Sequence, residues 1–121
     1  MPKSPAVKAR LSPEAEADLE DILEWSETHF GEGAAMRYAE LVIQALRDLE
    51  ADPHRPNARH LPELQPGLFS YHLANSRDRV VGDRVKTPRH FILYRQRSDD
   101  ILDVVRILHD SRDLAQHLPD D

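Results

Sequence analysis

The sequence predicts an α+β fold in which an N-terminal strand and an antiparallel helical hairpin pack on a small, mainly antiparallel sheet. Two long segments, 13–30 and 33–51, carry apolar residues at the three- and four-residue spacing of amphipathic helices. Two later segments, 90–97 and 101–109, are rich in the β-branched and aromatic residues that strands favour. With 121 residues the chain fits a single domain, 1–121, in which we expect 1–5 to be flexible and 119–121 to form a tail.

Composition excludes several classes of protein. Hydrophobic residues make up 40% and charged residues 31% of the chain, a balance unlike that of collagen-like, low-complexity or wholly disordered sequences. Cysteine is absent, which excludes disulfides and thiolate chemistry. No apolar run approaches the ~18–20 residues of a membrane span, and the start lacks the apolar stretch of a secretory signal. We therefore expect a soluble, cytoplasmic protein with no membrane partner.

The two helices have clear start and stop signals. Ser12 fits an N-cap, Pro13 fits the first helical position, and Gly31 fits a helix C-terminus. A link of only three residues, 31–33, forces the second helix to run antiparallel to the first. The second helix ends at Ala51, because Asp52-Pro53 stops it. The outer face of the first helix is acidic, as a solvated helix surface would be.

The remaining segments are assigned from weaker patterns. Residues 6–11 alternate weakly and predict a short edge strand, and residues 68–73 predict another strand. The proline-rich segment 53–66 reads as a connector rather than a domain boundary. Residues 74–89 fit a long loop or a poor hairpin equally well, and residues 110–118 fit one short helix.

The closing hairpin predicts which residues share a face of the sheet. A three-residue turn at 98–100 gives one face with the pairs Arg95–Asp103, Leu93–Val105 and Phe91–Ile107. The opposite face then carries the pairs His90–Leu108, Ile92–Arg106 and Tyr94–Val104. We expect the first face to lie under the helices. The second mixes apolar and polar side chains, which favours a surface for a partner.

Charge is unevenly distributed along the chain. The net charge is −6, and residues 1–53 hold 5 basic and 12 acidic side chains, whereas residues 54–121 hold 11 and 10. An acidic chain is a poor candidate for sequence-independent DNA binding, because such binding depends on cationic charge. An arginine-rich face in the second half could still contact an anionic partner.

No motif in the sequence requires an enzymatic function. The chain has no glycine-rich phosphate loop, no Gly-x-Ser-x-Gly elbow and no His-x-x-x-His pair, so we expect no metal and no cofactor. Arg106, His109 and Arg112 cluster where the last strand ends, which suggests the polar rim of a binding groove; His109 could instead cap the strand end. Trp25, at the edge of the first helix's apolar stripe, fits either the core or an anchor for a partner.

Three segments together resemble the ParE branch of the RelE/ParE toxin superfamily of type II toxin–antitoxin systems. They are Leu11-Ser12-Pro13-Glu14-Ala15-x-x-Asp18-Leu19-x-x-Ile22, Pro88-Arg89-His90-Phe91-Ile92-Leu93-Tyr94-Arg95, and Arg106-Ile107-Leu108-His109-Asp110-Ser111-Arg112-Asp113. The order of elements also agrees, and the resemblance spans about residues 6–118.

The resemblance implies a toxin that a ParD-like antitoxin of the ribbon–helix–helix, DNA-binding type holds inactive, and that blocks replication by inhibiting DNA gyrase. The residues expected to contact the antitoxin or the target are Trp25, His90, Tyr94, Arg106, His109 and Arg112.

Two alternatives stay open. RelE-type members cut messenger RNA on the ribosome, and for that activity the expected catalytic residues are Tyr94, Arg95, Arg106 and His109. The near absence of lysine argues against ribosome docking and favours the ParE interpretation. An inactive family member that only binds the antitoxin is the third possibility.

Overall fold

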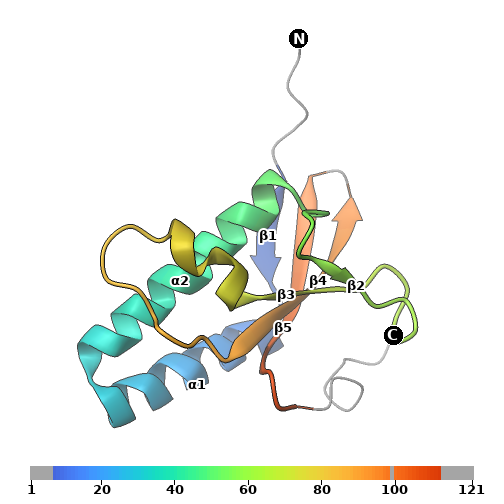
Figure 1. Ribbon diagram of the computed structural model, residues 1–121. Helices are drawn as coiled ribbons and strands as arrows, with labels where there is room; N and C mark the ends of the chain where they lie inside the picture. The colour runs from blue at the N-terminus through green and yellow to red at the C-terminus, as the bar shows by residue number, and fades with distance from the viewer. Residues whose placement is uncertain (1–6, 99, 113–121) are drawn as a thin grey trace.

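The computed structural model of the chain describes residues 7–98 and 100–112 and has the predicted α+β fold (Figure 1). The elements in chain order are β1 (Lys8–Leu11), α1 (Pro13–Phe30), α2 (Glu32–Ala51), β2 (Arg59–His60), β3 (Phe69–His72), the 3₁₀ helix η1 (Leu73–Arg79), β4 (His90–Ser98) and β5 (Ile101–His109). Among the described residues, no helix has the length and apolar character that crossing a bilayer requires.

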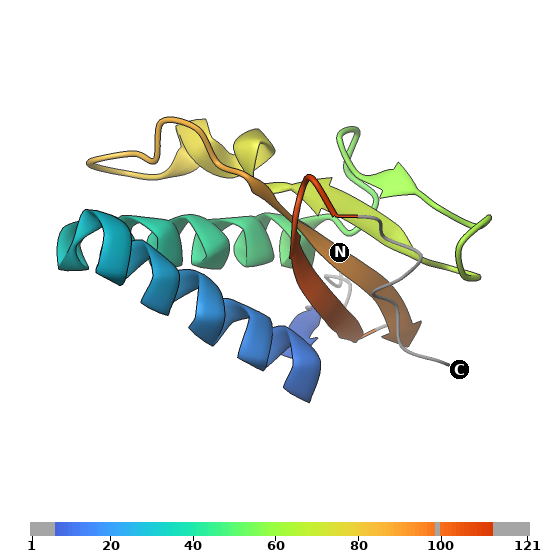
Figure 2. The same cartoon turned by 90° about the horizontal axis from the view of Figure 1, so that it is seen from below.

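The helical hairpin forms as its capping residues predict. The Ser12 hydroxyl accepts the backbone N–H of Ala15 at 3.0 Å, and Pro13 occupies the first turn of α1. Gly31 alone links the two helices, with a φ of 93° that lies in the region favouring glycine. α2 begins at Glu32, one residue earlier than predicted, and the helices run side by side in opposite directions (Figure 2).

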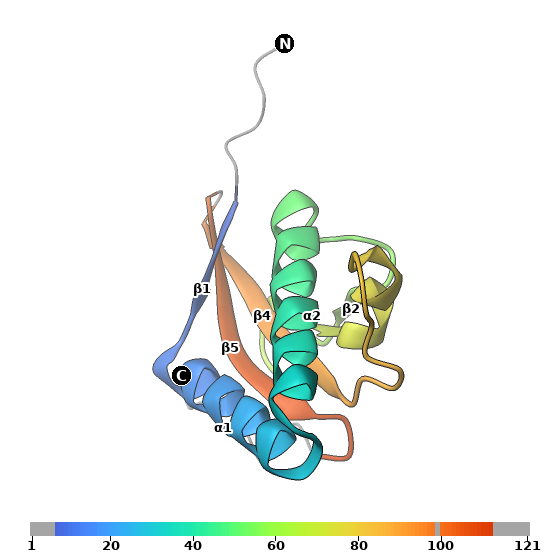
Figure 3. The same cartoon turned by 90° about the vertical axis from the view of Figure 1, so that its left-hand side faces the viewer.

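The five strands form one mixed sheet in the order β1-β5-β4-β3-β2. β1 is an edge strand, as predicted, and pairs in parallel with β5, whereas the other pairs are antiparallel. Viewed from the side of the helix ends, α2 lies in front of β4 and β5 and covers one face of the sheet (Figure 3). The main core fills the space between that face and the two helices.

The predicted register of the closing hairpin is correct only for residues 94–96. At the turn, Ser98 belongs to β4 and pairs with Ile101, so the predicted three-residue turn at 98–100 was wrong. Tyr94 pairs with Val104 and Arg95 with Asp103, as expected. The register then shifts by one residue, so that the remaining pairs are Leu93–Arg106, Ile92–Ile107, Phe91–Leu108 and His90–His109. The shift is a β-bulge at Val105, whose backbone oxygen accepts the Ser12 hydroxyl at 2.8 Å. The bulge thus lies at a long-range contact with the start of α1, which local turn chemistry cannot reveal.

The assignment of the two sheet faces was also wrong. Ile92 and Tyr94 lie in the main core under the helices, on the face that was expected to stay open. Leu93 lies on the opposite face and packs with Leu61 from the proline-rich connector and with Leu68, which directly precedes β3. Both faces of β4 are apolar, so the alternation pattern could not indicate which face the helices cover.

The undecided segment 74–89 is a 3₁₀ helix followed by an irregular stretch that projects over α2 toward the Gly31 end of the hairpin (Figure 1). A buried carboxylate on α2, Asp48, holds η1 in place. Its oxygens accept the Ser76 hydroxyl at 2.5 Å and Arg79 Nε at 2.9 Å, and the Tyr71 hydroxyl donates to Ser76. Of the helix predicted over 110–118, residues 110–112 form a turn, and the rest lie outside the described residues.

Candidate functional site: the basic groove

A groove of about 1020 Å³ lies at the open end of the helical hairpin. Its walls come from the end of α1, the start of α2, the irregular stretch before β4 and the end of β5. Its apolar floor includes Ile22, Trp25, Phe30, Tyr38 and Val85. Its cationic rim consists of Arg37, Arg84, Lys86, Arg89 and Arg112. We call these floor and rim residues together the basic groove.

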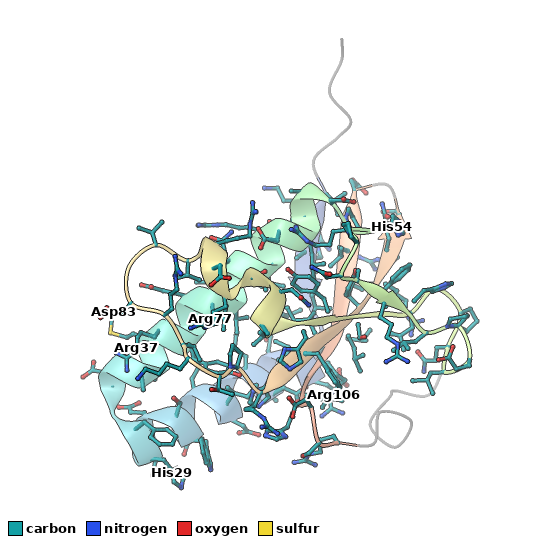
Figure 4. The ribbon with its side chains drawn as sticks, in the orientation of Figure 1. His29, Arg37, His54, Arg77, Asp83 and Arg106 are labelled. Atoms are coloured by element: carbon teal, nitrogen blue, oxygen red, sulfur yellow. The ribbon has the colours of Figure 1, made fainter. Side chains whose placement is uncertain are left out.

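The rim is more cationic than the chain as a whole. Five cations line the groove against two acids, Asp21 and Asp83, although the net charge of the chain is −6. Among the described residues, no carboxylate lies within salt-bridge distance of Arg37, Lys86 or Arg112. In Figure 4, Arg37 and Asp83 lie at the hairpin end of the molecule, well away from Arg106. Arg84 pairs with Asp78 and Arg89 with Asp110, so Arg37, Lys86 and Arg112 provide the positive charge that the described part of the chain does not neutralise.

Aromatic side chains at the end of α1 form an exposed apolar part of the floor. Trp25 is 56% exposed and Phe30 is 69% exposed. The His29 ring stacks on the Trp25 ring with 4.2 Å between centroids, and His29 Nδ1 lies 2.8 Å from the Trp25 backbone oxygen. The sequence left the core or a partner anchor open for Trp25, and its exposure excludes the core. Exposed tryptophan next to apolar surface is typical of anchoring positions in interfaces.

The inner wall of the groove is fixed by a short hydrogen-bond chain. The Tyr38 hydroxyl accepts the backbone N–H of Arg89 at 3.1 Å, so its own proton is directed to His90 Nδ1 at 2.6 Å. Burial, reinforced by the nearby His109, lowers the pKa of His90 to about 4. Burial also raises the pKa of Tyr38. Both side chains are therefore neutral near pH 7, and the positive charge comes from the rim.

Asp110 organises the end of β5. His72 Nδ1 accepts the backbone N–H of Ala74 at 3.0 Å, so its Nε2–H donates to Asp110 at 3.1 Å. Arg89 contacts the other carboxylate oxygen at 3.1 Å. The hydrogen bond from His72 is the main cause that lowers the pKa of Asp110. Asp110 thereby holds one rim cation, Arg89, in place.

Four of the predicted contact residues line the basic groove or its walls: Trp25, His90, His109 and Arg112. His109 also has the alternative structural role, because its Nδ1 accepts the backbone N–H of Ser111 at 3.1 Å. Sequence analysis missed most of the rim and part of the floor, namely Phe30, Arg37, Tyr38, Arg84, Lys86 and Arg89. These residues come from segments far apart in the sequence, and no spacing pattern connects them.

Tyr94 and Arg106 lie elsewhere and face the interior. Tyr94 is 1% exposed, and its hydroxyl donates to the backbone oxygen of Pro53 at 2.6 Å. Arg106 donates from Nε and from its terminal nitrogen to Asp18 on α1 at 2.7 and 2.8 Å. Their expected exposure on an open sheet face was wrong, because the helices cover the face that carries Tyr94 and Asp18 of α1 binds Arg106.

The residues expected for RNA cleavage do not share a surface. Tyr94 lies in the main core, and Arg95, next along β4, contacts Gln65 of the connector. Arg106 is bound to α1, and only His109 reaches the basic groove. Within the described residues, no group of three or more His, Cys, Asp or Glu side chains could hold a metal ion.

The comparisons with known proteins concern both the sequence and the fold. Residues 9–114 match the family model described as the ParE toxin of the type II toxin–antitoxin system parDE. Among solved structures, the chromosomal ParDE toxin–antitoxin system from P. aeruginosa is similar in fold, with a TM-score of 0.63 and 14% sequence identity over 86% of this chain and 96% of that chain. No curated protein matches the sequence.

Proposed function

The chain belongs to the ParE toxin family of type II toxin–antitoxin systems, and from this premise we propose that it arrests growth by inhibiting DNA gyrase. A ParD-like antitoxin of the ribbon–helix–helix type neutralises it, and both proteins are cytoplasmic. The family match supports the toxin role and the existence of an antitoxin partner. The gyrase target rests on the resemblance to the ParE branch.

The basic groove is the observation that carries the proposal for the antitoxin. An apolar floor with exposed Trp25 and Phe30 lies inside a cationic rim on an otherwise acidic chain. That combination suits an acidic, amphipathic segment that folds as it binds, with apolar side chains on the floor and carboxylates at the rim. The antitoxin then covers the groove rather than the sheet face that was first expected.

An activity assay with purified chain tests the toxin proposal. We expect the chain to inhibit DNA supercoiling by gyrase, and its expression to produce filamentous cells with a DNA-damage response. Early loss of protein synthesis with cut transcripts would instead identify a ribosome-dependent endoribonuclease. Absence of any growth effect, with antitoxin binding intact, would identify an inactive member.

A charge-reversal variant tests the antitoxin proposal separately. Arg37→Glu combined with Lys86→Glu should weaken binding of the protein encoded beside this chain's gene, because both side chains lie on the rim. Arg97→Glu is the matched control, because Arg97 lies on β4, outside the groove, near Asp103. Equal loss of binding in both variants would contradict the groove assignment.

A further inference from the structure

The basic groove has a second candidate occupant in the chain itself. Arg112 is a rim residue and is the last residue that the structure describes. Nine residues follow it in the sequence: Asp113, Leu114, Ala115, Gln116, His117, Leu118, Pro119, Asp120 and Asp121. This segment, 113–121, therefore starts at the wall of the groove.

The chemistry of segment 113–121 complements that of the groove. It contains three aspartates and no lysine or arginine, whereas the rim has five cations against two acids. Leu114 and Leu118 are four residues apart, so one turn of helix would place them on the same side. The segment thus combines acidic and apolar side chains, as the rim and the floor require.

We propose that segment 113–121 docks in the basic groove of its own chain, with Leu114 and Leu118 on the aromatic floor and its aspartates at the rim. Nine residues reach at most about 30 Å when extended, and the segment is tethered at the wall. Tethering gives the segment a high effective concentration at the groove, so it needs little intrinsic affinity.

When the segment is docked, it competes with any external partner for the basic groove. It protects the exposed Trp25 and Phe30 from water while no partner is bound. Any external partner must first displace the segment, which lowers that partner's apparent affinity. The inference goes beyond the proposed function, because docking requires neither the antitoxin nor the target.

Trp25 provides a direct reporter, because it is the only tryptophan of the chain and lies on the groove floor. The fluorescence of the full chain is compared with that of a chain ending at Arg112. We expect truncation to shift the emission to longer wavelength and to increase quenching by acrylamide. Adding a synthetic peptide of residues 113–121 should partly reverse both changes. All spectra are recorded at one pH.

Two further variants separate docking from loss of structure. The full-length double variant Leu114→Ser, Leu118→Ser should behave like the truncated chain, and so should the triple variant Asp113→Asn, Asp120→Asn, Asp121→Asn at low salt. Circular dichroism checks that each variant keeps its secondary structure. Identical emission and quenching in the full and truncated chains would overturn the proposal. A difference that disappears on dilution would also overturn it, because the segment would then bind a second copy.

Discussion

Arginines lie at the junction between α1 and β5 and also in the basic groove. At the junction the arginine has a carboxylate partner within the chain, whereas in the groove some of the cations have none in the part of the chain that the structure describes. At the junction, Arg106 and Asp18 are 21% and 13% exposed and form two parallel hydrogen bonds, and Asp18 also accepts the backbone N–H of Ile107 at 3.0 Å. In the groove, no carboxylate of the described residues neutralises Arg37 or Lys86. The comparison teaches that polar residues on a closing strand can serve the fold, whereas charge without an internal partner indicates a binding surface.

The largest effect on stability is expected at the junction. Asp18→Ala should lower the free energy of unfolding by about 2–3 kcal/mol, because it removes three hydrogen bonds and leaves Arg106 partly buried without its carboxylate. Urea denaturation measures the change. Glu20→Ala, on the exposed face of the same helix, is the control and should change stability by less than about 0.5 kcal/mol. Similar losses of unfolding free energy in the two variants would contradict the stabilising role of the Asp18–Arg106 contact.

In the groove, the same kind of truncation should affect binding rather than folding. Trp25→Ala should weaken antitoxin binding by about 2 kcal/mol, roughly 30-fold, because the side chain is an exposed aromatic anchor. Isothermal titration calorimetry measures the affinity. Met36→Ala is the matched control, since Met36 is 59% exposed on α2 but does not line the groove. A larger loss for Met36 than for Trp25 would place the partner on the outer face of α2.

A single rim charge should have a smaller effect that depends on salt. Lys86→Ala should weaken antitoxin binding by about 1 kcal/mol at low ionic strength, and by less at high ionic strength, because exposed charges are screened. Binding measured at two salt concentrations gives the difference. A salt-independent loss would show that Lys86 acts through packing and would contradict the electrostatic role of the rim.

A pH dependence of stability is expected from His90, and it appears only as the pH falls below neutral. Its pKa is lowered to about 4 in the folded chain, against an ordinary value of 6.5, so the unfolded chain binds the proton more readily. Stability should therefore fall as the pH decreases from about 6.5 to 4, and His90→Gln should flatten this part of the profile. The Asp110 pKa is lowered as well, so its contribution is lost only at still lower pH. Thermal unfolding measured across this pH range gives the dependence of stability on pH. If the variant shows the same dependence as the original chain, His90 is not its source.

Local patterns were enough to predict the elements of the fold. Ser12, Pro13 and Gly31 mark the limits of α1, and the β-branched and aromatic residues of 90–97 and 101–109 predict the closing hairpin. The faces of the sheet could not be predicted, because both sides of β4 are apolar and the covering connector lies some thirty residues earlier. The bulge at Val105 was missed for a related reason, since it lies at a contact with Ser12, 93 residues earlier in the sequence.

The candidate site was predicted only in part. Trp25, His90, His109 and Arg112 were identified because they are chemically distinctive or lie in the last strands. The cations Arg37 and Lys86 were missed, because only the path of the segment after η1 brings them together with Trp25. That path depends on the buried Asp48, which was not recognised as structural in the sequence.

The most direct test of the basic groove as the partner site is amide hydrogen exchange of the chain, free and bound to its antitoxin. Residues 81–87 contain no regular secondary structure in the free chain, and residues 83–87 line the groove, so their amides report its occupation. We expect the antitoxin to slow exchange in 83–87 and in the adjacent end of α1. Slowed exchange confined to the connector 61–68 and the far face of the sheet, with 83–87 unchanged, would contradict the assignment.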